Sequence, residues 1–123
     1  GYSSVVYRAQ CRRTGLPCVL KVYCLDAVID LYKFQIFREV WLHARLDHEN
    51  IIKLLAAFQE GDQVVLVEEY ADGRDLLALL QRHGGRLSEA LAVQAVLRPF
   101  VRALAYMHAQ GLLHRDVKPE NIL

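Results

Sequence analysis

The stretch that decides the fold closes the chain, and it reads His114-Arg115-Asp116-Val117-Lys118-Pro119-Glu120-Asn121-Ile122-Leu123. Three of its side chains combine complementary chemistry at short spacing. A carboxylate such as Asp116 can accept a proton from a hydroxyl. An ammonium such as Lys118 can hold a phosphoryl oxygen as a point charge. The amide oxygen of Asn121 is a hard ligand of the kind that Mg²⁺ prefers.

The same residues are expected to form a loop rather than a helix. Pro119 fixes its own φ and disfavours helical backbone at Lys118. Ile122 and Leu123 then begin an apolar strand that anchors the loop. The alternative is a charged turn on a solvated surface, but that alternative gives no reason for the polar stretch to follow directly on the apolar Leu112-Leu113.

This string resembles the catalytic loop of eukaryotic protein kinases, H-R-D-x-K-P-E-N, without a departure. The lysine at position 118 is typical of the serine/threonine kinases. The resemblance implies that Asp116 orients or deprotonates a substrate hydroxyl, that Lys118 steadies the γ-phosphate of ATP and that Asn121 holds Mg²⁺. It also places Leu123 among the residues that contact the nucleotide.

Composition fits one globular domain or part of one. The chain has 123 residues, of which 54% are apolar, enough for a sizeable core. Its 15 basic and 14 acidic residues leave a net charge of +1, which argues against nucleic acid and against a polybasic membrane patch. We identify no signal peptide and no apolar run long enough to span a bilayer. Cys11, Cys18 and Cys24 lack metal-ligand spacing, and we interpret them as reduced thiols of an intracellular protein, cytoplasmic or nuclear.

Two β-branched and aromatic runs near the N-terminus predict a hairpin, with strands over residues 5–7 and 18–23. The opening Gly1-Tyr2-Ser3-Ser4-Val5-Val6-Tyr7 resembles the tail of the kinase glycine-rich loop, with Gly1 at the second glycine and Val6 at the valine. An ordinary turn before a strand explains the pattern equally well. Ser4 replaces the third glycine but still supplies a backbone N–H for a phosphate.

Lys21 lies in the second of these strands, on the face that it shares with Val19. A lysine at such a position is either an edge residue that reaches water or an interior cation with a partner. The pattern of residues 28–46 predicts a helix, which carries Glu39 on a largely apolar stripe with Ile36. Glu39 therefore either meets water or pairs with Lys21, because a buried carboxylate without a partner is costly.

The kinase resemblance favours the pair. It implies that Lys21 holds the α- and β-phosphates of ATP and that Glu39 orients Lys21 from the helix that the family calls αC. Val19 replaces the alanine that lies over adenine in the family. A second apolar face of the helix is a candidate docking surface for a regulatory partner or an N-terminal segment, and it consists of Phe37, Val40, Trp41 and Ala44.

Two further strands are predicted over residues 52–58 and 64–67, joined by a turn over 60–63. The chain then leaves the sheet at residues 68–73, which resemble the hinge between the kinase lobes. The resemblance places the backbone of Glu69 and Ala71 against adenine and Asp75 near the ribose. Glu68 stands where the family screens a back pocket with an apolar residue or Thr, and it needs a partner such as Lys21, or water.

Two helices are predicted after the hinge, over residues 75–82 and 88–108. Gly84-Gly85 ends the first and Gly111 ends the second. Pro99 lies inside the second helix, and we expect it to kink that helix near Ala95 because proline has no N–H to donate.

The resemblance therefore implies an α+β, protein-kinase-like fold. Residues 1–70 would be the small lobe, with an antiparallel five-stranded sheet and αC, and residues 71–123 would be the start of the large lobe. The implied activity is ATP- and Mg²⁺-dependent phosphorylation of Ser or Thr hydroxyls on protein substrates. The spacing around Arg38-Glu39 and the string Glu69-Tyr70-Ala71 are similar to those of aurora kinases.

The alternative is a kinase-like module that binds or regulates without catalysis. The 123 residues contain no Asp-Phe-Gly, and they begin inside the glycine-rich loop. We therefore expect a truncated kinase domain whose turnover is negligible on its own.

Overall fold

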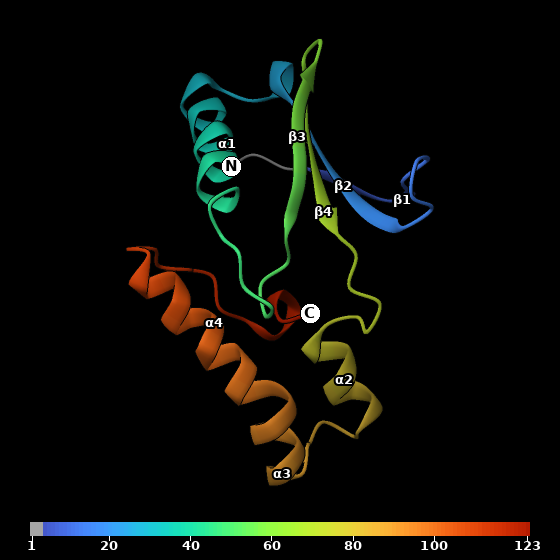
Figure 1. Cartoon of the computed structure of the whole chain (residues 1–123), viewed down its shortest axis with the longest axis vertical. Helices are drawn as coiled ribbons and strands as arrows, with labels where there is room; N and C mark the ends of the chain where they lie inside the picture. The colour runs from blue at the N-terminus through green and yellow to red at the C-terminus, as the bar shows by residue number, and fades with distance from the viewer. Residues whose placement is uncertain (1–3) are drawn as a thin grey trace. The chain divides into compact units, whose positions relative to one another are not determined.

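The computed structural model describes residues 4–123, which divide into two compact units. The first unit comprises residues 4–47 and 52–70, and the second comprises residues 48–51 and 71–123. The first unit combines a sheet with a helix and the second is helical (Figure 1). The α+β class is therefore as predicted. Gly1, predicted to contact a nucleotide, lies outside the described residues.

The first unit is built on an antiparallel sheet with strand order β1-β2-β4-β3. Both predicted hairpins are present, β1 with β2 and β3 with β4. The tight turn of the second hairpin relies on Gly61, whose φ of 60° costs glycine little. The strands are β1 (Val5–Gln10), β2 (Pro17–Cys24), β3 (Leu54–Glu60) and β4 (Gln63–Glu69).

The sheet has four strands within the described residues, where five were expected. Residues 4–70 contain four strand-forming runs, and the chain between them forms a helix and turns, so it leaves no segment for a fifth strand. The end of β4 also differs from the prediction. Glu68 and Glu69 still belong to the sheet, because Val19 pairs with Glu68 and Cys18 with Glu69.

One helix, α1 (Asp30–His43), covers a face of this sheet (Figure 1). It follows a 3₁₀ turn, Leu25–Ala27, and it is shorter than the predicted range of 28–46. It begins later because Ile29 has extended backbone, with φ −68° and ψ 154°. It ends earlier because the N–H groups of Arg45 and Leu46 bond three residues back, which tightens the chain out of the α-helix.

The core of the first unit lies between α1 and the sheet. Ile36 of α1 and Leu66 of β4 are fully buried, and Tyr23 of β2 is 2% exposed. Because directly paired residues point to the same face, the pairing of Lys21 with Leu66 places Lys21 on the face that α1 covers. The remaining members of the core are Leu25, Val28 and Val64, with Tyr32, Val40 and Leu54 packed against them.

Val40 was predicted to lie on the second, outward apolar face of α1, and that prediction was wrong. It packs against the core instead, because it follows Ile36 by one helical turn. Phe37 and Trp41 do lie on an exposed face, at 47% and 60% exposed.

The second unit contains α2 (Leu76–Arg82), α3 (Glu89–Leu91) and α4 (Arg98–Ala109). Asp75 Oδ1 accepts a hydrogen bond from Ala78 N at 2.8 Å, and Ser88 Oγ accepts one from Leu91 N at 3.2 Å. These two side chains cap the N-termini of α2 and α3. Glycines with positive φ follow α2 and α4, as predicted, and they are Gly84, Gly85 and Gly111.

A π-helical turn, Ala92–Leu97, joins α3 to α4 without a break. The disturbance that Pro99 was predicted to cause near Ala95 takes this form. Proline has no N–H for the carbonyl of Ala95, and its ring would clash with that carbonyl in a regular α-helix. The wider turn relieves the clash.

The continuous helix Glu89–Ala109 corrects another expectation. Its 21 residues are long and apolar enough to cross a membrane by length and composition alone, with a mean hydropathy of 1.2 in the most apolar window. This apolar segment was not identified from the sequence because Gln94, Arg98 and Arg102 interrupt it along one exposed side of the helix. Core helices of water-soluble proteins pass the same test, so the helix is weak support for a membrane span.

The last segment of the chain forms the predicted loop. Lys118 is extended, with φ −157° and ψ 159°, and a single 3₁₀ turn, Pro119–Asn121, follows it. The strand predicted from Ile122 is not formed. The carbonyl of Ile122 accepts a hydrogen bond from Leu76 N at 2.8 Å, so it is used by the start of α2 rather than by a strand ladder.

Replacing Ile36 with Ala should lower the free energy of unfolding by about 3 kcal/mol, because Ile36 is fully buried and its loss leaves a cavity between α1 and the sheet. Urea unfolding followed by circular dichroism measures this loss. Phe34, on the same helix, is 68% exposed and serves as the matched control. Phe34→Ala should change stability by less than about 0.5 kcal/mol, and equal losses in the two variants would contradict the packing described.

Candidate active site

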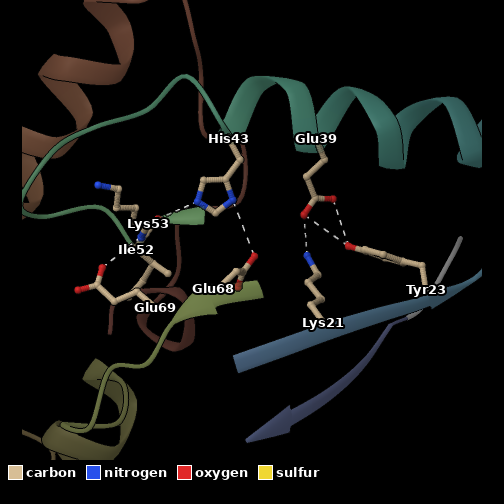
Figure 2. Close-up of polar contacts among 8 residues, drawn as sticks. All are labelled: Lys21, Tyr23, Glu39, His43, Ile52, Lys53, Glu68 and Glu69. Atoms are coloured by element: carbon tan, nitrogen blue, oxygen red, sulfur yellow. Dashed lines mark hydrogen bonds and ion pairs between the residues drawn. The ribbon is translucent and has the colours of Figure 1, made fainter. Parts of the chain in front are cut away.

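Lys21 of β2 and Glu39 of α1 form an ion pair between the sheet and the helix. Lys21 Nζ lies 2.7 Å from Glu39 Oε1, and Figure 2 shows the two side chains pointing toward each other. Their side chains are 27% and 31% exposed, so the pair is only partly reached by water. Of the alternatives left open by the sequence, the paired interior lysine is confirmed and the solvated edge lysine is wrong.

Tyr23 completes this cluster. Its hydroxyl donates to Glu39, with distances of 3.2 Å to Oε2 and 3.4 Å to Oε1. Lys21 Nζ also lies 5.2 Å from the centre of the Tyr23 ring, within the range of a cation–π contact. Tyr23 was not among the predicted site residues. Strand alternation could have found it, because Tyr23 follows Lys21 by two residues and therefore lies on the same face.

Opposing effects set the ionisation of Lys21 and Tyr23. Burial lowers the pKa of Lys21, but its hydrogen bonds with Glu39 and Tyr23 outweigh burial, so the pKa is raised above the usual lysine value. Burial raises the pKa of Tyr23 to about 12, although the neighbouring Lys21 ammonium acts to lower it. Near neutral pH the site therefore holds a charged ammonium and a neutral phenol.

Val6 and Val19, two residues predicted to contact a nucleotide, share the face of Lys21. Val6 pairs with Lys21 across β1 and β2, and Val19 lies two residues before Lys21 on β2. Val6 is 62% exposed, so its side chain is open to a ligand. The contact of these residues with a nucleotide stays a prediction.

Glu68 pairs with His43 rather than with Lys21. His43 Nδ1 lies 3.8 Å from Glu68 Oε1, and His43 Nε2 lies 2.7 Å from the carbonyl oxygen of Ile52 (Figure 2). Glu68 therefore has a partner, as expected, but the partner is His43 and not Lys21, which binds Glu39. Because β4 continues through Glu69, Glu68 stays on the face under α1, where it meets the histidine one helical turn after Glu39.

Glu69 and Asp75 have local structural contacts. Glu69 N donates to the carbonyl of Lys53 at 2.9 Å, and Glu69 Oε2 accepts from Lys53 N at 3.2 Å. Asp75 caps α2, a role that the sequence analysis did not assign to it. The adenine contacts of Glu69 and Ala71 and the ribose contact of Asp75 stay predictions.

In the second unit, Asp116, Lys118 and Asn121 lie together. Lys118 Nζ is 3.6 Å from Asp116 Oδ2. Asn121 Nδ2 donates to the carbonyl oxygen of Asp116 at 2.8 Å and to Asp116 Oδ2 at 3.0 Å. Asp116 N donates to His114 Nδ1 at 3.2 Å, and Arg115 adopts a φ of 67°, which a non-glycine residue adopts only where its surroundings enforce it.

The donor set of this loop fits Mg²⁺. Because the amide nitrogen of Asn121 is engaged by Asp116, the atom left for a cation is the carbonyl oxygen Oδ1, and no hydrogen bond from residues 4–123 occupies it. The described residues contain no cluster of three or more His, Cys, Asp or Glu side chains that could hold a metal by themselves. This combination suits a cation that arrives with phosphate oxygens, which is how proteins commonly bind Mg²⁺.

The sequence matches the family described as "Protein kinase domain" over residues 1–123. It is 38% identical to calcium/calmodulin-dependent protein kinase type IV of Homo sapiens, over the whole chain and 25% of that protein. It is 38% identical to an aurora kinase of Saccharomyces cerevisiae, over 96% of the chain and 32% of that protein. It is 32% identical to serine/threonine-protein kinase ATG1a of Arabidopsis thaliana, over the whole chain and 19% of that protein.

The chain spans between about a fifth and a third of the length of these curated relatives. The similarity to aurora kinases that the sequence suggested is present. A calcium/calmodulin-dependent kinase has the same 38% identity, so the likeness is shared with other groups of protein kinases.

Replacing Tyr23 with Phe should make the stability of the chain less sensitive to alkaline pH. The pKa of Tyr23 is about 12 in the folded chain against 10.0 for an unperturbed tyrosine, so the folded state holds the phenol proton more tightly. The stabilisation is complete below pH 10 and is lost as the pH rises toward 12. Urea unfolding at pH 9.5 and pH 11.5 should show that the wild type loses about 2 kcal/mol more than the variant.

Tyr7, which is 53% exposed, provides the matched control. Tyr7→Phe should keep the wild-type loss between the two pH values. A loss in Tyr23→Phe as large as in the wild type would show that the fold does not raise the pKa of Tyr23.

Proposed function

The chain belongs to the protein kinase family, and from that premise we propose that it takes part in the transfer of the γ-phosphoryl group of ATP to Ser or Thr hydroxyls of protein substrates. The observation that carries the proposal is the 2.7 Å ion pair between Lys21 and Glu39. An ammonium that a carboxylate already holds in place can bind phosphate oxygens with little reorganisation. Similarity to serine/threonine-protein kinases such as ATG1a supports Ser and Thr as acceptors.

The first set of proposed roles concerns the nucleotide. Lys21 binds the α- and β-phosphates, and Val6 and Val19 supply apolar surface for adenine. The backbone of Gly1 contacts the phosphates. The backbone of Glu69 and Ala71 contacts the edge of adenine, and Asp75 contacts the ribose. These assignments follow the kinase motifs, and the common face of Val6, Val19 and Lys21 supports the roles of these three residues.

In the second unit, the Asp116 carboxylate orients the attacking hydroxyl and accepts its proton. Lys118, 3.6 Å from that carboxylate, holds the γ-phosphate, and Leu123 contacts the nucleotide. Asn121 holds Mg²⁺ through Oδ1, because its amide nitrogen is bound to Asp116. Bound Mg²⁺ neutralises the negative charge that the phosphates bring.

We assign residues 1–70 to the kinase small lobe and residues 71–123 to the start of the large lobe. The division of the structure after Tyr70 supports this assignment, with residues 48–51 as the exception. An intracellular location is supported by the free thiols of Cys11, Cys18 and Cys24.

The exposed side of α1 is proposed to bind a regulatory partner. A hollow there is lined by Phe34, Phe37, Arg38 and Trp41. The Arg45 guanidinium lies 4.6 Å from the centre of the Trp41 ring, so the surface combines aromatic area with positive charge. A partner segment with apolar and acidic side chains fits this surface. Trp41 is the single tryptophan of the chain, so a blue shift of its emission would report that a partner covers it.

ATP with Mg²⁺ should raise the apparent melting temperature of the chain, because a ligand that binds the native state stabilises it. Lys21→Met should weaken ATP binding at least about tenfold, since it removes a charge-assisted contact to the phosphates. Calorimetric titration with and without Mg²⁺ measures the affinity. The magnesium dependence should be reduced in Asn121→Ala.

Lys33→Met is the matched control, because Lys33 also forms an ion pair, 3.3 Å from Asp30, but on the surface of α1. It should bind ATP as the wild type does. A wild-type chain that shows no ATP-dependent stabilisation would favour the alternative, a kinase-like module that binds or regulates without catalysis.

A further inference from the structure

His43 contacts two acceptors at once. Its Nε2 lies 2.7 Å from the carbonyl oxygen of Ile52, and its Nδ1 lies 3.8 Å from Glu68 Oε1, as Figure 2 shows. A carbonyl oxygen can only accept, so Nε2 carries the proton of that hydrogen bond. In the neutral ring Nδ1 therefore presents a lone pair to the carboxylate, whereas in the imidazolium both nitrogens donate. The contact with Glu68 is favourable for the charged ring.

The other charged groups around this ring have partners of their own. Lys21, Glu39 and Tyr23 bind one another. Glu69 accepts from the backbone of Lys53. Glu68 is therefore the carboxylate that faces the ring. The charged and titratable side chains that Figure 2 draws around His43 are Glu39 on α1, Lys21 and Tyr23 on β2, Lys53 before β3, and Glu68 and Glu69 on β4.

The position of His43 gives this contact a mechanical role. His43 is the last residue of α1, one helical turn after Glu39, and the fully buried Ile36 lies one turn before Glu39. Ile36 attaches the helix to the sheet through apolar packing. His43 attaches its end through the carbonyl of Ile52 and the carboxylate of Glu68. Glu39 is thus held between an apolar and a polar attachment.

We propose that His43 is a positioning residue whose protonated ring fastens the end of α1 to Ile52 and Glu68, and so keeps Glu39 in place against Lys21. Loss of the ring proton removes the attraction to Glu68 and loosens the end of the helix. The link between this attachment and nucleotide affinity rests on the proposed function. The attachment itself does not.

The direction of the pH dependence follows from the charge of the ring. Histidine changes its charge between about pH 5 and pH 8. The coupling between His43 and Glu68 needs the imidazolium, so it is present on the acid side of this range and lost as the pH rises through it. The side chains of His43 and Glu68 are each 19% exposed, which limits screening by water and salt.

A double-mutant cycle at two pH values tests the proposal. The proteins are the wild type, His43→Gln, Glu68→Gln and the double variant, and the measurement is the unfolding equilibrium constant in urea. Gln at position 43 keeps an N–H for the Ile52 carbonyl but cannot be protonated. The coupling factor between the two sites should be about fivefold to tenfold at pH 5.5 and below about twofold at pH 8.5. A coupling that is equal at both pH values overturns the proposal.

Nitrogen NMR of the wild-type ring keeps the test valid if Glu68→Gln does not fold. At pH 8.5 the neutral ring should carry its proton on Nε2, and a proton on Nδ1 would overturn the proposal. His83 supplies the control, because its Nδ1 lies 3.0 Å from the carbonyl of Leu79 in its own helix, away from any acidic partner in the described chain. His83→Gln should leave the His43–Glu68 coupling unchanged.

ATP titration separates this inference from the proposed function. For each protein, the dissociation constant of ATP at pH 8.5 is divided by the constant at pH 6. This ratio should be about twofold to fivefold larger in the wild type than in His43→Gln. Comparing the two proteins also cancels the effect of the titration of ATP itself. Equal ratios would overturn the link between His43 and nucleotide affinity. Absence of ATP binding at both pH values would overturn the proposed function, while the double-mutant cycle would still decide the attachment.

Discussion

An ammonium placed under a helix destabilises a protein unless a carboxylate meets it, and this constraint organises the first unit. The register of β2 against β4 places Lys21 opposite the fully buried Leu66, on the face that α1 covers. Glu39 Oε1, on the helix, accepts a hydrogen bond from Lys21 Nζ at 2.7 Å, and the Tyr23 hydroxyl donates a further hydrogen bond to the same carboxylate. Removing one member would leave a partly buried charge without its partner, which is more costly than never having formed the pair. The sheet and helix therefore depend on each other through a polar contact as well as through the core.

The segment over residues 114–123 of the second unit depends on a constraint of another kind. The contacts that join His114, Asp116, Lys118 and Asn121 span no more than five residues along the chain. Proline and a positive φ at Arg115 shape the backbone between them. Such a segment carries its geometry in its own sequence. This is why its loop structure could be predicted from residue types and spacing alone, while the contacts between β2, α1 and β4 could be predicted only in part.

This difference between local and long-range contacts explains which features of the structure could be predicted from the sequence. Alternation along β2 and the apolar stripe of α1 left the pairing of Lys21 with Glu39 as one of two alternatives, and the kinase resemblance favoured it. Turn residues located both hairpins and the ends of α2 and α4, but not the ends of α1. The partner of Glu68 was missed, because it depends on how far β4 remains in the sheet, and pairing with β2 decides that rather than the residues of β4 themselves. The strand expected at Ile122 failed for the same reason, since a strand needs a neighbour and the carbonyl was bound by Leu76.

The π-helical turn at Ala92–Leu97 has a consequence for how the long helix tolerates changes in chain length. A regular α-helix advances by about 100° per residue, and a π turn accommodates one residue more than an α turn. Deleting a single residue there would restore regular hydrogen bonding and leave the residues after it in nearly the same angular phase, so Ala103, 7% exposed, would stay on the buried side. The π turn therefore absorbs one extra residue. It preserves the angular phase between the two halves of the helix and allows a proline to follow without ending it.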